Sequence, residues 1–477
     1  MKGFSKCIHV IRACFLGCAL LVPDIVLAIP GVVPGIPEPE RRNVIVQLFN
    51  WRFDDIKSVI PTLKELGYSH VHVSPPQQSN DHVWQWWGRY QPIDFSHIQG
   101  WLGTEQEFQA LNDEAEHHDM QIIVDVVFNH TVDVSEVDDP SLIVLQNNVV
   151  VSEHFPQFSP DDFHPRCTIN DHDPGTVRRC WLSNNLADLK TESAHVRTVA
   201  RQYLQKLVNL GVDGFRFDAA KHIEPEFFSD VLSAAPGKYA FGEIIEQSVN
   251  DYFKVDVLDF YDFPLVTAMR EAFAFGRDLR LLINAQQNNR ALPGPKAVTF
   301  VRNHDIDRGQ NDDRGLIDGR ALYGVGWDES HRRLDRTDVN LAYAFLFGRE
   351  DGLPYVFVDM KTLPLDQQDD RFDDPHLVAG IRFHNLCLAN PDGSNRRPDI
   401  WQIQTQNTIG WQRGTDRFVI INKAAEAYAI NNLKTSLQKG SYKEVRTGWP
   451  LQVEADGTIK EWNVPPRTSV MFVRIGD

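Results

Sequence analysis

The nine residues Gly214-Phe-Arg-Phe-Asp-Ala-Ala-Lys-His222 decide the fold of this chain. Side chains of a β-strand alternate between its two faces, so Phe215 and Phe217 lie on one side and Arg216 and Asp218 on the other. The charged pair of a buried strand must then face the axis of a barrel. A barrel needs further strands of the same kind elsewhere in the chain.

Seven more short apolar runs have the length and composition of buried strands, at residues 44–49, 69–73, 122–127, 239–243, 255–260, 297–301 and 355–358. Amphipathic helical patterns lie between them at 104–117, 193–210, 225–235 and 338–347. A weaker pattern at 54–66 is interrupted by Pro61. Eight alternations of strand and helix predict an α/β fold of the (β/α)8 TIM-barrel type.

Two segments depart from this alternation. Residues 131–187 are rich in Asp, Pro, Asn and His and are too long for a connecting loop, so we predict an excursion domain after the third strand. Short alternating strands at 408–412, 417–422, 442–446 and 469–474 predict a C-terminal antiparallel β-sandwich domain over 386–477. The barrel is assigned to 29–130 and 188–385.

Residues 1–28 have the features of a secretory signal peptide. Lys2, Lys6 and Arg12 precede an apolar run at 13–22, and small residues follow it. No stretch reaches the roughly 18 apolar residues of a membrane span, so we expect a secreted protein, extracellular or periplasmic, without a membrane partner. A lipoprotein cleavage site at Leu16-Gly17-Cys18 remains an alternative.

The composition excludes several classes of protein. Among 477 residues, 42% are hydrophobic and the net charge is −17, which is ordinary for a globular chain and unlike a collagen, a coiled coil or a disordered protein. The acidic balance argues against a nucleic-acid partner, because such binding needs clustered Lys and Arg. We expect a monomer with a neutral substrate.

Three of the six cysteines lie in the predicted signal peptide. Cys167 and Cys180 are close together in a turn-rich stretch, which suits a local disulfide in an oxidising compartment. Cys387 lies in a mostly apolar stretch and is predicted to be a buried free thiol.

Three acids follow predicted strands: Asp218, Glu243 and Asp305. The carboxyl ends of parallel strands meet at one rim of a barrel, so these acids should converge there. Two carboxyls roughly 5 to 5.5 Å apart support retaining hydrolysis of a glycoside, and Arg216 would keep the nucleophile ionised. The alternatives are a helix cap or surface ion pair for each acid, and a purely structural buried pair of Arg216 with Asp218.

Four segments, in this order, resemble the signature segments of the α-amylases, a large family of retaining glycoside hydrolases with a calcium-stabilised barrel. They are Asp125-Val-Val-Phe-Asn-His130, residues 214–222, Phe241-Gly-Glu243 and residues 300–305. Residues 47–51, 73–76 and 86–91 extend the resemblance, whose pattern looks closest to animal-type amylases and their bacterial relatives. It spans about residues 43–360, with a departure at Arg302, where the family often has Asp.

The resemblance implies a role for each matching residue. Asp218 resembles the nucleophile, Glu243 the acid/base, and Asp305 the residue that positions the sugar and stabilises the transition state. The expected substrate-binding residues are Trp86, Trp87, Tyr90, Gln91, His130, Arg216, Lys221, His222 and His304. The aromatic ones would form a wall on which pyranose rings stack, and a purely structural aromatic cluster is the alternative.

The resemblance also implies a calcium cage. Asn129, Asp188, the carbonyl of His222 and, by its position relative to Cys180, the carbonyl of Arg178 match the family's ligands. Oxygen ligands of this kind suit a hard cation. In the alternative, Asp188 is an acid at a helix start near Thr191.

Arg216, Asn303 and Arg349 occupy positions that resemble the anion-binding triad of chloride-activated amylases. Arg349 follows a predicted helix, and we expect its side chain to reach the barrel interior. Arg216 and Arg349 near one nucleophile would then favour a bound chloride. In the alternative, Arg349 pairs with Glu350, Asp351 or another carboxylate and no halide binds.

We therefore expect a secreted, endo-acting α-amylase that hydrolyses α-1,4-glucosidic bonds of starch, glycogen and maltooligosaccharides with retention of configuration. A maltooligosaccharide-producing or transglycosylating relative would share every catalytic residue. A barrel that binds glucan without cutting it is the alternative from another class, and intact Asp218, Glu243 and Asp305 weigh against it.

Overall fold

The computed structural model describes residues 33–80, 86–133, 145–146, 149–150, 157–183, 185–245, 256–308, 334, 336–359, 371–390 and 392–476. The predicted signal peptide lies outside these residues. Within them, no helix combines the length and the apolar character needed to cross a membrane.

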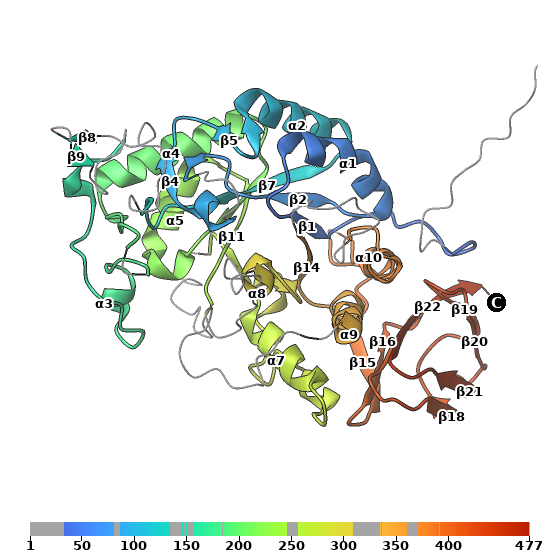
Figure 1. Ribbon diagram of the computed structural model, residues 1–477. Coiled ribbons are helices and arrows are strands. Elements are labelled where there is room, and N and C mark those ends of the chain that lie inside the picture. The colour runs from blue at the N-terminus through green and yellow to red at the C-terminus, as the bar shows by residue number, and fades with distance from the viewer. Residues whose placement is uncertain are drawn as a thin grey trace, which may run out of the picture.

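Eight parallel strands close into a barrel at the centre of the molecule (Figure 1). In order around the barrel they are β1 (Ile45–Leu48), β14 (Leu353–Val358), β13 (Ala297–Phe300), β12 (Asp259–Tyr261), β11 (Tyr239–Gly242), β10 (Gly214–Phe217), β7 (Gln121–Val126) and β2 (His70–Val73). Each corresponds to one of the eight predicted strands, so the predicted fold class is confirmed.

Helices pack around the barrel: α1 (Phe53–Leu66), α2 (Glu105–His117), α4 (Ala194–Asn209), α5 (Pro225–Val231), α7 (Phe263–Phe273), α9 (Arg336–Gly348) and α10 (Pro375–Cys387). A capping box starts α2, where Thr104 and Glu107 each accept a hydrogen bond from the other's main-chain N–H. Helix α1 continues through Pro61 because its apolar face remains buried, and it ends at Gly67, whose φ of 101° suits glycine.

The predicted excursion contains short elements: β8 (Leu145–Gln146), β9 (Val149–Val150), η4 (Pro160–Asp162) and α3 (Pro174–Val177). Figure 1 shows β8, β9 and α3 on the side of the barrel away from the C-terminal strands. Cys167 and Cys180 form a disulfide with an S–S distance of 2.03 Å, whereas Cys387 is free and buried. A bridge between His130 and Asp188 joins the two chain segments that flank the excursion, and a bridge between Phe163 and Leu189 joins the excursion to the segment after it.

The C-terminal part is antiparallel. One sheet has the order β15 (Asp399–Gln404), β16 (Thr408–Arg413), β17 (Arg417–Asn422), β22 (Thr468–Gly476), β19 (Gly440–Glu444) and β20 (Pro450–Val453). A second sheet pairs β18 (Tyr428–Lys434) with β21 (Thr458–Val464). Both sheets contribute to one buried cluster, which includes Phe418, Phe472, Ile430 and Ile459, so they form a sandwich.

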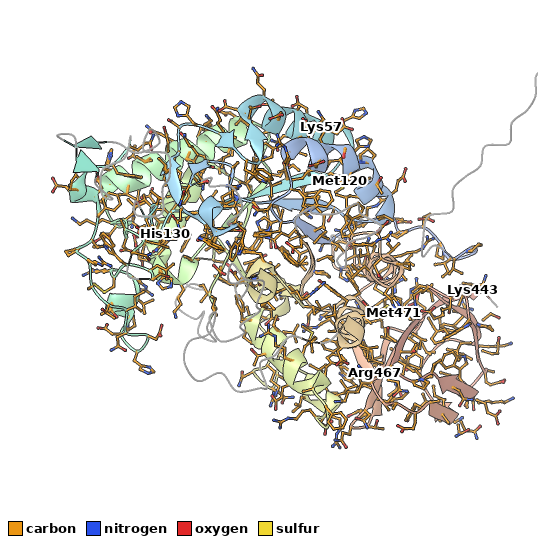
Figure 2. The ribbon with its side chains drawn as sticks, viewed as in Figure 1. Lys57, Met120, His130, Lys443, Arg467 and Met471 are labelled. Carbon is orange, nitrogen blue, oxygen red and sulfur yellow. A yellow bond between two sulfur atoms is a disulfide. The ribbon has the colours of Figure 1, made fainter. Side chains whose placement is uncertain are left out.

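The C-terminal sheet also shares the hydrophobic core of the barrel. Trp411 of β16 and Met471 of β22 belong to the same buried cluster as the barrel strands, and Figure 2 shows Met471 beside α9. The indole N–H of Trp411 donates to the carbonyl of Gly348 at 3.0 Å. A Cβ at position 348 would lie 2.7 Å from the Trp411 ring, so this contact requires glycine.

The remaining short elements lie in the connections between these strands and helices. They are β3 (Gln78–Ser79), η1 (Trp86–Tyr90), β4 (Pro92–Asp94), β5 (Gln99–Gly100), β6 (Gly103–Thr104), η5 (Ala220–His222), η6 (Leu232–Ala234), η7 (Leu279–Leu282), η8 (Gly294–Lys296) and α8 (His304–Arg308). Two of them, η1 and α8, carry side chains of the site described next.

Candidate active site

The barrel brings the predicted acids to the carboxyl ends of three strands, at one rim. Asp218 follows β10 directly, Glu243 follows β11, and Asp305 lies in the first turn of α8 after β13. The predicted alternation in β10 is confirmed, because Phe217 packs on Phe228 of helix α5 at 5.1 Å whereas Arg216 faces the acids.

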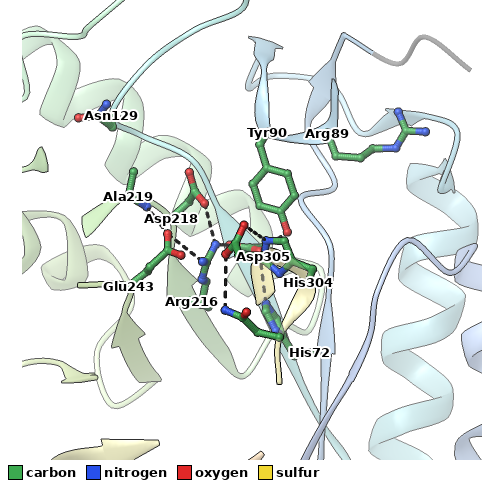
Figure 3. A network of polar contacts seen from close by, with 12 residues as sticks. His72, Arg89, Tyr90, Asn129, Arg216, Asp218, Ala219, Glu243, His304 and Asp305 are labelled. Carbon is green, nitrogen blue, oxygen red and sulfur yellow. Dashed lines mark hydrogen bonds and ion pairs between the residues drawn. The ribbon is translucent and has the colours of Figure 1, made fainter. Parts of the chain in front are cut away.

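Arg216 is fully buried and connects these acids (Figure 3). Its Nη1 lies 2.7 Å from Oδ1 of Asp218 and 2.8 Å from Oδ1 of Asp125 in β7. Its Nη2 lies 3.0 Å from Oε2 of Glu243, and that oxygen also accepts a hydrogen bond from the main-chain N–H of Ala219 at 3.1 Å. The guanidinium therefore fixes two predicted catalytic carboxylates relative to each other.

The charges around Arg216 are mainly negative. Burial raises the pKa of Asp218 well above its usual value, and Glu243 and Asp125 add to that rise while Arg216 opposes it. Burial also raises the pKa of Asp305, which shares a hydrogen bond with Glu243. The expected effect of Arg216 on Asp218 is therefore present, but burial outweighs it and the pKa of Asp218 is raised rather than lowered.

Asp125 is the exception in this cluster. Burial raises its pKa too, but Arg216 and His72 outweigh that effect and lower the pKa to about 2. Asp125 is therefore the permanent counter-ion of Arg216 at neutral pH.

An aromatic wall lies beside the acids. The ring of His304 stacks on Phe49 at 4.7 Å and on Tyr90 at 5.0 Å, and Trp86 meets it edge-on at 5.6 Å. Nε2 of His304 lies 3.5 Å from Oδ1 of Asp305. The structure therefore brings together the predicted residues Trp86, Tyr90 and His304 next to a catalytic acid.

Other predicted substrate-binding residues support this wall or lie at its edge. Trp87 packs edge-on against Trp86 at 6.0 Å, and the side chain of Gln91 accepts a hydrogen bond from Asn80 at 3.0 Å. Nε2 of His130 lies 2.8 Å from the carbonyl of Tyr90. Burial lowers the pKa of His130 to about 4, so this ring is neutral under ordinary conditions.

Lys221 and His222 contact the excursion. Nζ of Lys221 lies 3.2 Å from Oδ1 of Asp171, and Nδ1 of His222 lies 2.8 Å from the carbonyl of Val177. These contacts join η5, which follows Asp218, to the segment that carries the disulfide. The two side chains thereby link the excursion to the catalytic rim.

The four predicted calcium ligands come from segments that the same contacts bring together. The N–H of Leu189 donates to the carbonyl of Asn129, which places Asp188 next to Asn129. The contact of His222 with the carbonyl of Val177 places His222 next to Arg178. The alternative for Asp188 as a helix-start acid is wrong, because the side chain of Ser193 caps α4.

Asp188 has the properties of a metal ligand. Its Oδ2 lies 2.7 Å from Nδ1 of His164, whereas its buried Oδ1 has no hydrogen-bond partner in the described part of the chain. Burial raises the pKa of this carboxyl to about 7. Among the described residues no three His, Cys, Asp or Glu side chains are grouped to hold a metal, so a cation here would depend on the Asn129 amide and on carbonyl oxygens.

The predicted anion triad is not assembled. Asn303 is buried and its side chain approaches Asp305 at 3.5 Å, near the acids. Arg349, in contrast, lies between α9 and β14, at the amino end of that strand. Its charge there opposes the rise that burial causes in the pKa of Asp262 and Asp399. The prediction that Arg349 joins Arg216 is wrong, and its alternative, pairing with carboxylates, fits the geometry.

Three residues of the site were not assigned a role from the sequence. Asp125 lies opposite Arg216 in the register of β7 and β10, and His72 and Tyr355 lie below it in β2 and β14. Asp125 could have been found from the alternation in 121–126. His72 and Tyr355 resemble ordinary strand residues and gave no comparable signal.

The barrel and the clustered acids define a glycoside hydrolase. Residues 53–240 match the family model "Alpha amylase, catalytic domain". An α-amylase of Aeromonas hydrophila is 29% identical over 459 residues, covering 88% of this chain and 93% of that protein. An α-amylase of Tenebrio molitor is 26% identical over 448 residues, covering 85% and 89%.

Solved structures agree in fold. The crystal structure of α-amylase I from Eisenia fetida matches with a TM-score of 0.73 and 23% identity, covering 93% of this chain and 98% of that one. A variant of that amylase in complex with maltohexaose matches equally well in TM-score. The chain is therefore similar to α-amylases in sequence and in fold.

Proposed function

We propose that the protein is a secreted, monomeric, endo-acting α-amylase that hydrolyses α-1,4-glucosidic bonds of starch, glycogen and maltooligosaccharides with retention of configuration. The observation that carries the proposal is the contact of Arg216 with both Asp218 and Glu243, which holds two carboxyl groups at one rim. Retaining glycosidases need such a pair, with one group as nucleophile and the other as acid and then base.

In the first step, a carboxylate oxygen of Asp218 attacks the anomeric carbon while Glu243 gives its proton to the glycosidic oxygen. Arg216 holds Oδ1 of Asp218, so Oδ2 is the oxygen that the geometry offers for attack. In the second step, Glu243 takes a proton from a water molecule whose oxygen bonds to the anomeric carbon, and the carboxylate of Asp218 leaves as the glycosyl–Asp218 bond breaks.

Asp305 and the aromatic wall would hold the sugar between these two groups. Tyr90 and Trp86 present aromatic rings to the C–H faces of a pyranose, while Asp305 beside His304 can accept hydrogen bonds from its hydroxyls. Asp305 also shares a hydrogen bond with Glu243, which places its carboxyl beside the proposed acid.

Calcium is part of the proposal. Asn129, Asp188 and the carbonyls of Arg178 and His222 would hold the ion, and its charge would compensate the buried carboxylate of Asp188. When bound, the ion supplies a structural bond between the barrel and the excursion. The catalytic steps are carried by the chain's own acids.

The test of this function is a time course of products from soluble starch. An endo-acting hydrolase should lower the iodine colour of starch well before small sugars accumulate, and proton NMR of the fresh products should show the α-anomer. Initial β-anomer would contradict the two-step mechanism. Cleavage of starch without an increase in the number of reducing ends would indicate transfer to sugar, and no cleavage at all would indicate a binding protein.

Secretion has its own test. The proposed leader, residues 1–28, has basic residues followed by an apolar run. N-terminal sequencing of the protein recovered from the medium or periplasm should begin near residue 29. A cytoplasmic protein that starts at Met1 would contradict this part of the proposal.

A further inference from the structure

We propose that His72 is a positioning residue of this site. Tyr355 orients the imidazole ring of His72 so that its Nε2 faces Asp125. Asp125 in turn holds Arg216 toward Asp218 and Glu243. The inference rests on the proposed function, because its effect is measured on glucan hydrolysis. Figure 3 shows His72 below Arg216, on the side of the barrel interior.

The contacts form a continuous buried network. Nδ1 of His72 lies 2.7 Å from the hydroxyl of Tyr355, and its Nε2 faces Oδ2 of Asp125 at 3.6 Å. Asp125 holds Arg216 through Oδ1 at 2.8 Å. The side chains of His72, Asp125, Arg216 and Tyr355 have no solvent exposure, so their polar groups interact with one another rather than with bulk water.

The protons of this network have one consistent arrangement. Asp125 is ionised and can only accept, so the nitrogen that faces it, Nε2 of His72, carries the proton. Burial lowers the pKa of His72, so the ring is neutral and Nδ1 must accept. The hydroxyl of Tyr355 is therefore the donor to Nδ1, which fixes the tautomer and the angle of the ring.

Asp125 transmits this orientation to the catalytic acids. Its Oδ2 also accepts a hydrogen bond from the hydroxyl of Tyr90 at 2.9 Å, while its Oδ1 holds Arg216. The N–H of His72 shifts the negative charge of the Asp125 carboxylate toward Oδ2, so Asp125 attracts Arg216 less strongly. The guanidinium then interacts more strongly with Asp218 and Glu243. Without the N–H of His72, Asp125 would attract Arg216 more strongly and shift the two carboxyl groups that Arg216 holds.

The separation of 3.6 Å is a polar contact rather than a full hydrogen bond. In a site without substrate, such contacts are often long and tighten when the substrate binds. The expected effect of His72 is therefore on the chemical step, and thus on kcat, more than on KM.

Two substitutions at the same position separate the roles of the two ring nitrogens. His72→Gln places an amide N–H near the position of Nε2, whereas His72→Asn places its amide near Nδ1, toward Tyr355. We expect His72→Asn to lower kcat by about 10- to 100-fold with KM within about twofold, and His72→Gln to restore most of the loss. Tyr355→Phe removes the donor to Nδ1 and should lower kcat to an intermediate value.

His70→Asn is the matched control, because His70 lies on the same strand near its amino end, where its Nδ1 contacts Ser69 at 2.7 Å. It should leave kcat unchanged. Thermal unfolding of every variant shows whether a loss of activity reflects loss of fold. A merely structural role would make His72→Gln and His72→Asn lose stability alike and keep the same kcat.

Equal kcat values for folded His72→Gln and His72→Asn would overturn the inference, and so would a change confined to KM. If His72→Asn does not fold, Tyr355→Phe decides: a kcat equal to that of the wild type contradicts the inference. An inactive wild-type protein would instead contradict the proposed function, so the two failures are distinguishable.

Discussion

Arg216 determines the behaviour of the acids at the scale of single residues. A buried guanidinium needs compensation, and Asp125, Asp218 and Glu243 all lie within 3.0 Å of its nitrogens. Burial raises the pKa of Asp218 and Asp305, and the neighbouring acids of the cluster add to the rise. A neutral sugar can enter such a site without adding to the excess charge.

Removing either reacting carboxyl should abolish most of the activity. Asp218→Asn loses the nucleophile and Glu243→Gln loses the proton donor, so each should lower kcat by roughly 10⁴-fold or more while the fold persists. Initial rates on a maltooligosaccharide, together with circular dichroism and melting curves, check this. Asp171→Asn, which changes an exposed acid in the excursion, is a matched control and should keep kcat within about twofold.

Single residues also show what could be predicted from the sequence. Asp218 and Arg216 were placed correctly because the period of a strand fixes which side chains face inward. Arg349 was misplaced because it belongs to a connection between a helix and a strand, where no period applies. His72 and Tyr355 acquire their importance only from the neighbours that barrel closure brings to them.

At the scale of elements, the barrel strands were easier to predict than the helices. The strands are buried on both faces and appear as continuous apolar runs. Helices α7 and α10 were missed because most of their side chains are buried, so they lack the single apolar stripe by which a surface helix is recognised. Amphipathic α2, with its capping box, was placed to within one residue.

The start of α7 contains a group whose charge should make stability depend on pH. Oδ1 of Asp262 accepts hydrogen bonds from the N–H groups of Leu265 and Leu292. Burial raises the pKa of this carboxyl to about 6, although Arg349 opposes the rise. Because the folded state binds the proton more tightly than the unfolded state, this group stabilises the fold in acid and loses that contribution as the pH rises through 6.

Asp262→Asn keeps the acceptor oxygen and removes the charge. The free energy of unfolding of the wild type, relative to that of the variant, should fall by roughly 2 kcal/mol between pH 4.5 and pH 7.5. Urea unfolding at the two pH values measures this difference. A difference that does not change with pH would contradict the raised pKa.

At the scale of the whole molecule, two attachments hold parts of the chain to the barrel. The excursion is attached through the disulfide-bearing segment and the contacts of His222 and Lys221, whereas the C-terminal sheet shares the barrel's hydrophobic core. The sequence predicted both parts from changes in pattern. Their modes of attachment depend on contacts between distant residues and could not be predicted.

The proposed calcium ion should stabilise the attachment of the excursion. At a free concentration 100 times its Kd, an ion that binds only the native state adds about 2.7 kcal/mol, which corresponds to several degrees in Tm. Chelation with EDTA should lower Tm, and added Ca²⁺ should restore it. Asp188→Asn should melt at the same temperature with and without Ca²⁺.

The melting temperature of metal-free protein tests the proposed calcium site directly. Metal-free protein, verified by elemental analysis, that melts at the same temperature as untreated protein would exclude the cage. Mg²⁺ in place of Ca²⁺ is the control for ionic strength, since its smaller octahedral shell suits carbonyl-rich sites less well.

The contact of Trp411 with Gly348 has a consequence for the order of events during synthesis. The carbonyl that ends α9 receives its hydrogen bond from a residue 63 positions later, and Arg413 donates to the same carbonyl. The barrel is closed by pairing of β1 with β14, the first and last of its strands in the chain. A growing chain folds from its N-terminus, so the barrel cannot close before β14 has been made. In the same way, the carbonyl at the end of α9 cannot receive its hydrogen bond before Trp411 has been made. The most N-terminal strand of the enzyme is therefore unpaired on one edge for most of translation.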